Sequence, residues 1–189
     1  APFNLVGMKP GDQHEIRRDL IVEAFEVAHG RNVPALGFVA FERRRKLLPE
    51  FANLSGPEIV AIKKAGREVT HTLEAPLVAY LGDTEVFDLP TRRLVSEAKI
   101  LVAECTFFEA DHRSRAKAGY HTHLLDVPRL LEMTQAQAVV LTHLTRRTSL
   151  RAARTALARM LSPEQLSRIH FLMDRRRSVP TDEPKTQET

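Results

Sequence analysis

Three residues whose side chains can bind a metal stand at the ends of three apolar, β-like runs. They are His29, Asp83 and His143. A strand that stops on an imidazole or a carboxylate places a ligand at the rim of a sheet, where loops converge and charge stays out of the core. Three such endings, the middle one Gly-Asp-Thr, favour a metal-dependent hydrolase. The runs that they close are residues 20–29, 77–83 and 138–143.

The elements that must position these residues change in type along the chain. Helices are predicted at 91–98, at 124–133 and from 149 onward, where apolar residues recur at steps of three and four. Strands first and alternating strands and helices afterwards predict an α/β layered domain. On β-branched content and bounding Gly or Pro, strands are predicted at 19–28, 36–42, 67–73, 77–82, 99–106, 137–142 and 168–173.

Composition sets the broad class. The chain has 189 residues, 43% of them hydrophobic, and no apolar stretch of 18 residues that could span a membrane, so a membrane partner is not expected. A single cysteine, Cys105, fits a reducing compartment, and we expect a cytoplasmic protein. With 28 basic and 24 acidic residues, any anion site must come from local clusters.

The two ends of the chain suggest its domain boundaries. It begins Ala1-Pro2-Phe3 without an initiator Met, which suggests a piece of a longer protein. Residues 1–175 are expected to form one domain. Residues 176–189 carry two prolines and several acidic residues with little apolar content, and we expect a disordered tail there.

The order of several segments resembles the C-terminal half of a metallo-β-lactamase-fold hydrolase, specifically of the ribonuclease Z (tRNA 3′-end processing) family. The resemblance covers roughly residues 5–148 and implies an α/β fold of the αββα-sandwich type, of which this chain would be about the C-terminal half. The matching segments are residues 28–39, 55–57, 62–69, 80–84, 103–107, 121–123 and 141–147.

This resemblance implies a role for each strand-end residue. Asp83 corresponds to the aspartate that bridges two zinc ions, and His29 and His143 to histidines that each bind one of them. Glu104 is a candidate acceptor for the second N–H of a ligating imidazole. The cofactor implied is a pair of zinc ions, with other divalent metals as an alternative.

His121 corresponds to a histidine that binds no metal in the family and protonates the departing 3′ oxygen. An imidazole suits this work because both of its protonation states are available near neutrality. Here the sequence differs from the family, which continues with two small hydroxyl residues, because His123 follows Thr122. His123 could therefore compete for the role or bind metal itself.

The family's N-terminal His-x-His-x-Asp-His motif, which supplies most of the metal ligands, does not occur in residues 1–189. Three ligands shared by two ions leave both under-coordinated. We therefore expect this chain alone to be inactive, and to need an N-terminal half or a partner chain. A homodimer is left open.

The protruding arm by which many family members hold tRNA is expected to be shortened or lost, because only 53 residues separate His29 from Asp83. The cations that remain in this interval could attract phosphate but lack interleaved aromatic residues for base stacking. The candidate phosphate contacts are Arg43, Arg44, Lys63 and Lys64.

Three functions remain open. The leading one is a ribonuclease Z-like endoribonuclease that acts on a tRNA precursor through a zinc-bound hydroxide. The second is a small-molecule esterase or cyclic phosphodiesterase of the same fold, which loss of the arm would favour. The third is a degenerate, non-catalytic module that keeps the fold without metal.

Overall fold

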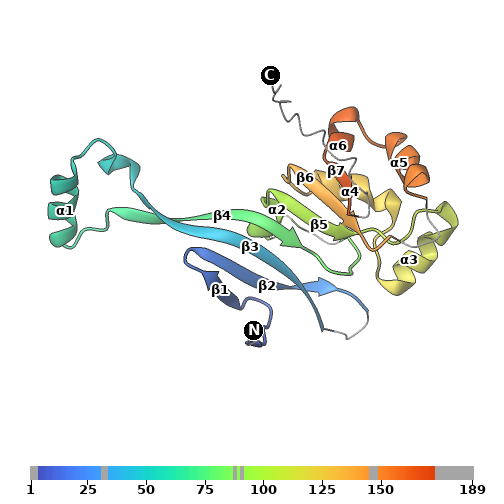
Figure 1. Cartoon of the computed structure of the whole chain (residues 1–189), viewed down its shortest axis with the longest axis horizontal. Coiled ribbons are helices and arrows are strands. Elements are labelled where there is room, and N and C mark those ends of the chain that lie inside the picture. The colour runs from blue at the N-terminus through green and yellow to red at the C-terminus, as the bar shows by residue number, and fades with distance from the viewer. Residues whose placement is uncertain (1–3, 31–33, 87–88, 90–91, 145–148, 173–189) are drawn as a thin grey trace, which may run out of the picture.

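The chain forms one seven-stranded sheet whose strands follow one another in sequence order, with helices packed on it (Figure 1). The computed structural model describes residues 4–30, 34–86, 89, 92–144 and 149–172. The first four strands pair antiparallel and the last four pair parallel. The strands are β1 (Gln13–Arg17), β2 (Leu20–Ala28), β3 (Pro34–Leu47), β4 (Thr70–Tyr80), β5 (Ile100–Glu104), β6 (Ala138–Thr142) and β7 (Ile169–Phe171).

Six helices and three short 3₁₀ turns complete the described part of the chain. No helix in that part is long and apolar enough to cross a bilayer. The helices are α1 (Gly56–Lys64), α2 (Arg93–Ser96), α3 (Arg113–Gly119), α4 (Val127–Glu132), α5 (Leu150–Ala158) and α6 (Pro163–Ser167). The 3₁₀ turns are Pro49–Phe51, Ala110–His112 and Leu124–Asp126.

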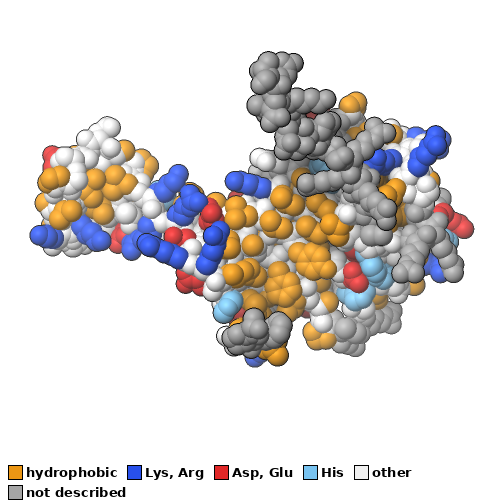
Figure 2. Space-filling view, in the orientation of Figure 1, with side chains coloured by type: hydrophobic (Ala, Val, Ile, Leu, Met, Phe, Trp, Pro, Cys, Tyr) orange, Lys and Arg blue, Asp and Glu red, His pale blue; other side chains and the backbone are white. Residues whose placement is uncertain are grey.

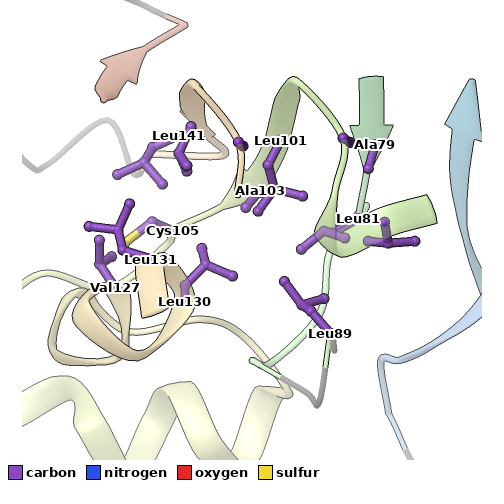
Figure 3. Packing of buried hydrophobic residues seen from close by; sticks show 14 of the residues in the cluster. Ala79, Leu81, Leu89, Leu101, Ala103, Cys105, Val127, Leu130, Leu131 and Leu141 are labelled. Carbon is purple, nitrogen blue, oxygen red and sulfur yellow. The ribbon is translucent and has the colours of Figure 1, made fainter. Parts of the chain in front are cut away.

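The core lies between one face of the sheet and the helices (Figure 3). Cross-strand partners share a face of a sheet, so the register places one row of small and branched side chains on this side. Helices α2, α4 and α5 cover the row with apolar residues that are 1% exposed or less, among them Val95, Val127 and Leu157. The row consists of Val39, Ala79, Leu101 and Val139.

The opposite face of the same strands is apolar and, among the residues that the structure describes, uncovered. Figure 2 shows hydrophobic side chains gathered over these strands on the side toward the viewer. Tyr80 remains 46% exposed and Ile100 38% exposed on this face. A contiguous apolar surface of this kind marks a packing interface. Two cross-strand rows form it: Phe38, Tyr80, Val102 and Val140, and beside them Ala40, Val78, Ile100 and Ala138.

The strand directions explain how residues distant in sequence can meet. β2 and β4 both run antiparallel to β3, and β5 and β6 run parallel to β4. All four strands therefore end at the same edge of the sheet. Loops that follow parallel strands converge at such an edge, which is where α/β sheets place their binding sites.

The arm, which was expected to be shortened or lost, is present. β3 and β4 continue beyond the body of the sheet as a two-stranded antiparallel ribbon, paired from Glu42 with Ala75 out to Leu47 with Thr70, and α1 lies at its tip (Figure 1). A strand advances about 3.3 Å per residue, so a short insertion still reaches far when both of its strands are extended. The tip has a small core of its own around Phe51 and Val69.

Most predicted strands and helices are confirmed to within a few residues, with one clear error. The segments 67–73 and 77–82 form a single strand, β4, because Pro76 lies at the bulge between Ala40 and Phe41 of β3. A bulge tolerates a residue that lacks an N–H. Strand β1 and helices α1, α3 and α6 were not predicted. The expected tail, residues 176–189, lies outside the described residues.

Candidate active site

The four predicted active-site residues lie together at the edge where β2, β4, β5 and β6 end. The ring of His121 lies 5.2 Å from that of His29 and 5.3 Å from that of His143, measured between centroids. An Asp83 carboxylate oxygen, Oδ1, lies 3.6 Å from Nδ1 of His143. Residues 29, 83, 121 and 143 thus form one cluster that is built from four separate loops.

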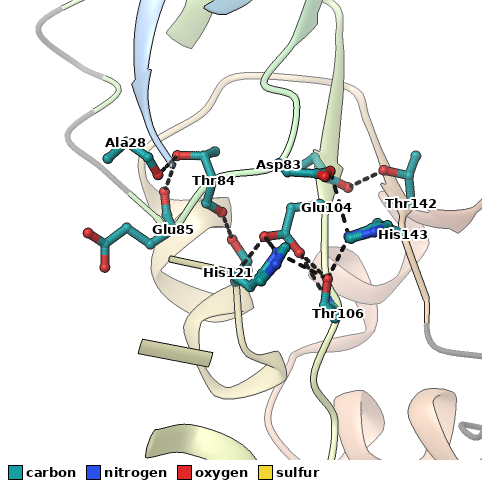
Figure 4. A network of polar contacts seen from close by, with 11 residues as sticks. Ala28, Asp83, Thr84, Glu85, Glu104, Thr106, His121, Thr142 and His143 are labelled. Carbon is teal, nitrogen blue, oxygen red and sulfur yellow. Dashed lines mark hydrogen bonds and ion pairs between the residues drawn. The ribbon is translucent and has the colours of Figure 1, made fainter. Parts of the chain in front are cut away.

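Glu104 is the buried centre of this cluster (Figure 4). Its Oε1 accepts hydrogen bonds from the backbone N–H of Thr122 at 2.8 Å and from Nδ1 of His121 at 2.9 Å. Its Oε2 accepts from the backbone N–H and the hydroxyl of Thr106, at 3.0 and 2.7 Å. Two donors on each oxygen fill the acceptor capacity of an ionised carboxylate, which makes its burial tolerable.

Thr106 links the glutamate to His143 and fixes the tautomer of that imidazole. Its only hydroxyl hydrogen goes to Glu104, so the hydroxyl oxygen must accept the contact with His143 Nδ1 at 2.8 Å. Nδ1 of His143 therefore carries the hydrogen, and Nε2 keeps a lone pair that can bind metal. The backbone of His143 has φ of 55°, a left-handed conformation that costs about 1–3 kcal/mol outside glycine.

Successive side chains of an extended backbone point to opposite sides, which places the residues of the cluster on one side and a core residue on the other. Glu104 and Thr106 point into the cluster, while Cys105 between them is fully buried within the hydrophobic core. Burial raises the pKa of the Cys105 thiol well above its ordinary value, chiefly because a thiolate would lose its hydration. The single cysteine is thus a packing residue.

His121 is held by its own turn as well as by Glu104. It follows Tyr120, whose left-handed φ of 56° ends α3, and its backbone N–H donates to Ala116 O at 2.9 Å. A Cβ on Gly119 would lie 3.1 Å from Cδ2 of the imidazole, so glycine leaves room for the ring. Because Glu104 takes the hydrogen on Nδ1, Nε2 of His121 is the nitrogen that can exchange a proton with a substrate.

One ring nitrogen of His29 lacks a hydrogen-bond partner among the described residues. Nδ1 of this half-buried residue is the one buried side-chain nitrogen or oxygen that lacks a hydrogen-bond partner within the described part of the protein. An unpaired buried polar atom costs about 1–3 kcal/mol and calls for an explanation. A metal ion or a donor from a further polypeptide segment would supply the missing partner.

A different triad has ligand atoms close enough to one another to hold a metal. Atoms of Glu104, His121 and His143 lie within 4.8 Å of one another. Glu104 already accepts four hydrogen bonds, so it would have to break some of them to bind an ion. The set of His29, Asp83 and His143 has no such conflict, because it offers the unpartnered His29, a half-exposed carboxylate and a free Nε2.

The predicted role of Glu104 as acceptor for a ligating imidazole stays a prediction. Its direct imidazole partner is His121, and it reaches the candidate ligand His143 only through Thr106. Thr106 itself was not singled out from the sequence. Its position two residues after Glu104 could have identified it, because residues two apart on an extended strand share a face.

The alternative that His123 replaces His121 is wrong. His123 is 1% exposed, and both of its ring nitrogens have partners. Nδ1 accepts from the backbone N–H of Leu125 at 3.1 Å, and Nε2 donates to the carbonyl oxygen of Glu109 at 2.9 Å. His123 caps the turn at Leu124–Asp126 and has no free nitrogen for metal or substrate.

Two threonines join the loops that carry the cluster. The Thr84 hydroxyl donates to Ala28 O at 2.9 Å, which ties the Gly-Asp-Thr loop to the end of β2 (Figure 4). The Thr122 hydroxyl donates to Thr84 O at 2.8 Å and ties the His121 loop to both. These buried bonds hold the ends of β2 and β4 and the turn after α3 in one fixed arrangement.

The candidate phosphate contacts lie on the arm and not at this cluster. Arg43 donates to Glu74 through two nitrogens, at 3.2 and 2.8 Å, and Arg44 pairs with Glu42 at 2.5 Å. These pairs largely cancel the charge of the arginines. Lys63 and Lys64, exposed at the end of α1 on the arm tip, have no ion pair within 4 Å in the described residues.

Glu104→Gln is expected to lower the free energy of unfolding by about 1–3 kcal/mol, because the amide NH₂ would face donors where an oxygen now accepts two bonds. Urea unfolding of the intact protein measures the change. Glu97→Gln is the matched control, since Glu97 forms only a surface pair with Arg93 and should change stability by about 0.5 kcal/mol or less. Equal effects of the two substitutions would contradict this account of the Glu104 hydrogen bonds.

Sequence comparison identifies relatives over most of the chain. No family model matches it. The chain is 32% identical over 161 residues to the chloroplastic tRNase Z TRZ2 of Arabidopsis thaliana, a match that covers 84% of this chain and 45% of that protein. It is 32% identical over 164 residues to tRNase Z TRZ1 of the same plant, covering 85% and 58%. The chain is homologous to one part of tRNase Z. The predicted resemblance to ribonuclease Z is thereby confirmed.

Structural comparison supports the predicted fold. The metallo-β-lactamase fold protein YhfI of Bacillus subtilis superposes with a TM-score of 0.55 at 16% identity, over 88% of this chain and 52% of that protein. The α/β fold of metallo-β-lactamase type is therefore confirmed. The described residues form one sheet with its helical layer, which is half of an αββα sandwich. The chain spans about half the length of the curated tRNase Z relatives it matches.

Proposed function

We propose that this chain is the part of a metal-dependent, ribonuclease Z-like endoribonuclease that supplies the general acid and three metal ligands. The observation that carries the proposal is the His121–Glu104 pair, placed within about 5 Å of two candidate ligand histidines. A histidine whose Nδ1 is held by a buried carboxylate is oriented for proton transfer at Nε2. The homology to tRNase Z supports the same reaction class.

His29, Asp83 and His143 would hold the metal, and their nitrogen and oxygen donors suit zinc. A bound zinc ion would polarise a phosphoryl oxygen and acidify a water molecule. With His29 and His143 on different ions and Asp83 shared between them, each ion would have two protein ligands from this chain, fewer than the three of a catalytic zinc site. Both ions of the proposed pair need ligands from further residues.

His121 would deliver a proton from Nε2 to the 3′ oxygen that leaves the scissile phosphate. The carboxylate of Glu104 accepts the hydrogen bond from Nδ1 and keeps the ring in position. Thr106 holds His143 and Glu104 in one hydrogen-bonded chain, so the proposed ligand and the proposed acid keep a fixed geometry. General acid catalysis of this kind contributes about 10²–10⁴ in rate.

A second layer would complete the sandwich. The uncovered face of β3, β4, β5 and β6 is apolar, and packed sheets cover such faces at about 10 Å spacing. We propose that the remaining ligands arrive on a sheet that packs here, from another part of the protein or from a partner chain. The coverage of about half of each relative supports this.

The arm favours an extended RNA substrate over a small ester. The small-molecule alternative rested on loss of the arm, and the arm is present with unpaired Lys63 and Lys64 at its tip. We propose that these two lysines contact phosphates of the RNA at a distance from the cleavage site. Such contacts raise affinity without reading sequence.

The direct test is cleavage of a precursor tRNA with a 3′ trailer by the intact protein loaded with zinc. The expected products are a tRNA with a 3′ hydroxyl and a trailer with a 5′ phosphate. The 189-residue chain alone should show no turnover, since it lacks ligands for a full site. Failure of the intact protein to cut the precursor, with zinc bound, would contradict the proposal. Turnover by the chain alone would show that the missing layer is not needed.

A further inference from the structure

A cavity of about 260 Å³ adjoins His121 and has no role in the proposed proton transfer. Helix α3, the start of α4 and the segment after β4 enclose it, and His121 forms part of its wall. Sites for small organic ligands usually measure about 300–1,000 Å³. This cavity is slightly smaller, so it suits a single nucleotide unit better than an extended ligand.

The charges that line the cavity favour an anion. Arg113 pairs with Asp126 at 3.3 Å, so these two largely cancel. Lys117 and Arg129 are exposed and have no carboxylate within 4 Å among the residues that the structure describes. Glu85 is the remaining carboxylate. Two unpaired cations against one acid leave the cavity net positive, beside a histidine that faces the proposed reaction centre.

The chemistry of the cleavage decides which anion would bind here. The proposed acid, His121, must contact the leaving 3′ oxygen, and that oxygen belongs to the nucleotide on the 5′ side of the scissile bond. The same nucleotide carries its own 5′ phosphate. A cavity next to His121 would therefore receive the leaving nucleotide, whereas the phosphate on the trailer side lies across the reaction centre.

We propose that this cavity is the binding site of the leaving nucleotide, with Lys117 and Arg129 holding the phosphate 5′ to the scissile one. The inference rests on the proposed endoribonuclease function. Lysine and arginine contacts to phosphate fix the position of the strand and carry no base specificity. The site would thus align any sequence so that its 3′ oxygen meets Nε2 of His121.

The test is a chemical double-mutant cycle on the intact protein. A short RNA carries one neutral methylphosphonate, either at the phosphate 5′ to the scissile bond or at the phosphate 3′ to it. With the wild-type protein, the 5′ replacement should lower kcat/KM roughly tenfold to hundredfold, the range for a lost hydrogen bond between charged groups. The double variant Lys117→Ala/Arg129→Ala should lose a similar factor on unmodified RNA and little more when the 5′ phosphate is already neutral.

Two matched variants show whether any lost cation has the same effect. The variants are Lys99→Ala and Arg18→Ala. Lys99 immediately precedes β5, at the opposite end of the parallel strands, and Arg18 lies in the β1–β2 turn with a side chain that is 95% exposed. Both should keep the full 5′ methylphosphonate defect. An equal defect in wild type and double variant, or coupling only to the 3′ phosphate, would overturn this assignment while RNA cleavage stands. Absence of RNA cleavage by the wild-type protein would overturn both proposals.

Discussion

Replacing His121 by alanine in the intact protein should lower turnover of an RNA substrate by about 10²–10⁴ and leave the bound metal unchanged. The reason is geometric. Nδ1 of His121 is engaged by Glu104 at 2.9 Å, so the ring supplies a proton at Nε2 and is not required as a ligand. Turnover under saturating substrate and metal content by atomic emission measure the two quantities. His14→Ala, an exposed histidine on β1, is the matched control.

The leaving group gives this prediction a sharper form. A nitrophenolate needs little protonation, so the His121→Ala defect on a nitrophenyl phosphodiester should be at least about tenfold smaller than on RNA. An equal defect on both substrates would mean that His121 has a structural role. Loss of metal in His121→Ala would instead favour the alternative triad of Glu104, His121 and His143.

Asp83→Ala should remove metal and turnover together. Replacing an outer-sphere partner of a metal ligand already costs about 10–100-fold, so loss of the proposed shared ligand should exceed about 100-fold. The folded state should tolerate the change, because the Asp83 side chain is 43% exposed and its contact with His143 spans 3.6 Å. Zinc titration and thermal unfolding separate the two effects.

Asp12→Ala is the matched control for this substitution. Asp12 is an exposed aspartate whose carboxylate accepts only a local hydrogen bond from the Lys9 N–H, so metal content should stay constant. A fully active Asp83→Ala protein with unchanged zinc would remove Asp83 from the site and leave the two histidines without a bridging carboxylate.

The position of the site could be predicted because each ligand candidate ends an apolar run. His29, Asp83 and His143 follow β2, β4 and β6, and a polar residue directly after a buried strand lies at the edge of the sheet for any loop conformation. That these three strands run in the same direction could not be read from local patterns. β2 and β4 share a direction because β3 lies between them and pairs antiparallel with both.

The hydrogen bonds within the candidate site were harder to predict than the identity of its residues. Loop geometry decides which imidazole donates a hydrogen bond to the Glu104 carboxylate. Thr106 bridges Glu104 and His143 by hydrogen bonds that residue spacing alone does not predict. His123 was kept as an alternative to His121 because the sequence shows that it is a histidine but does not show the two hydrogen bonds that occupy its ring nitrogens. Loss of the arm was one of the two expected outcomes because the residue count was equated with reach, although two extended strands span far with few residues.

The most direct test of the central claim is anomalous diffraction at the zinc edge from crystals of the intact, zinc-loaded protein. We expect a peak about 2.0–2.2 Å from a ring nitrogen of His29 or Nε2 of His143 and from an Asp83 carboxylate oxygen, with Glu104 still hydrogen-bonded to Thr106 and His121. A peak bound by Glu104 and His121, or none at His29, Asp83 and His143, would contradict the account.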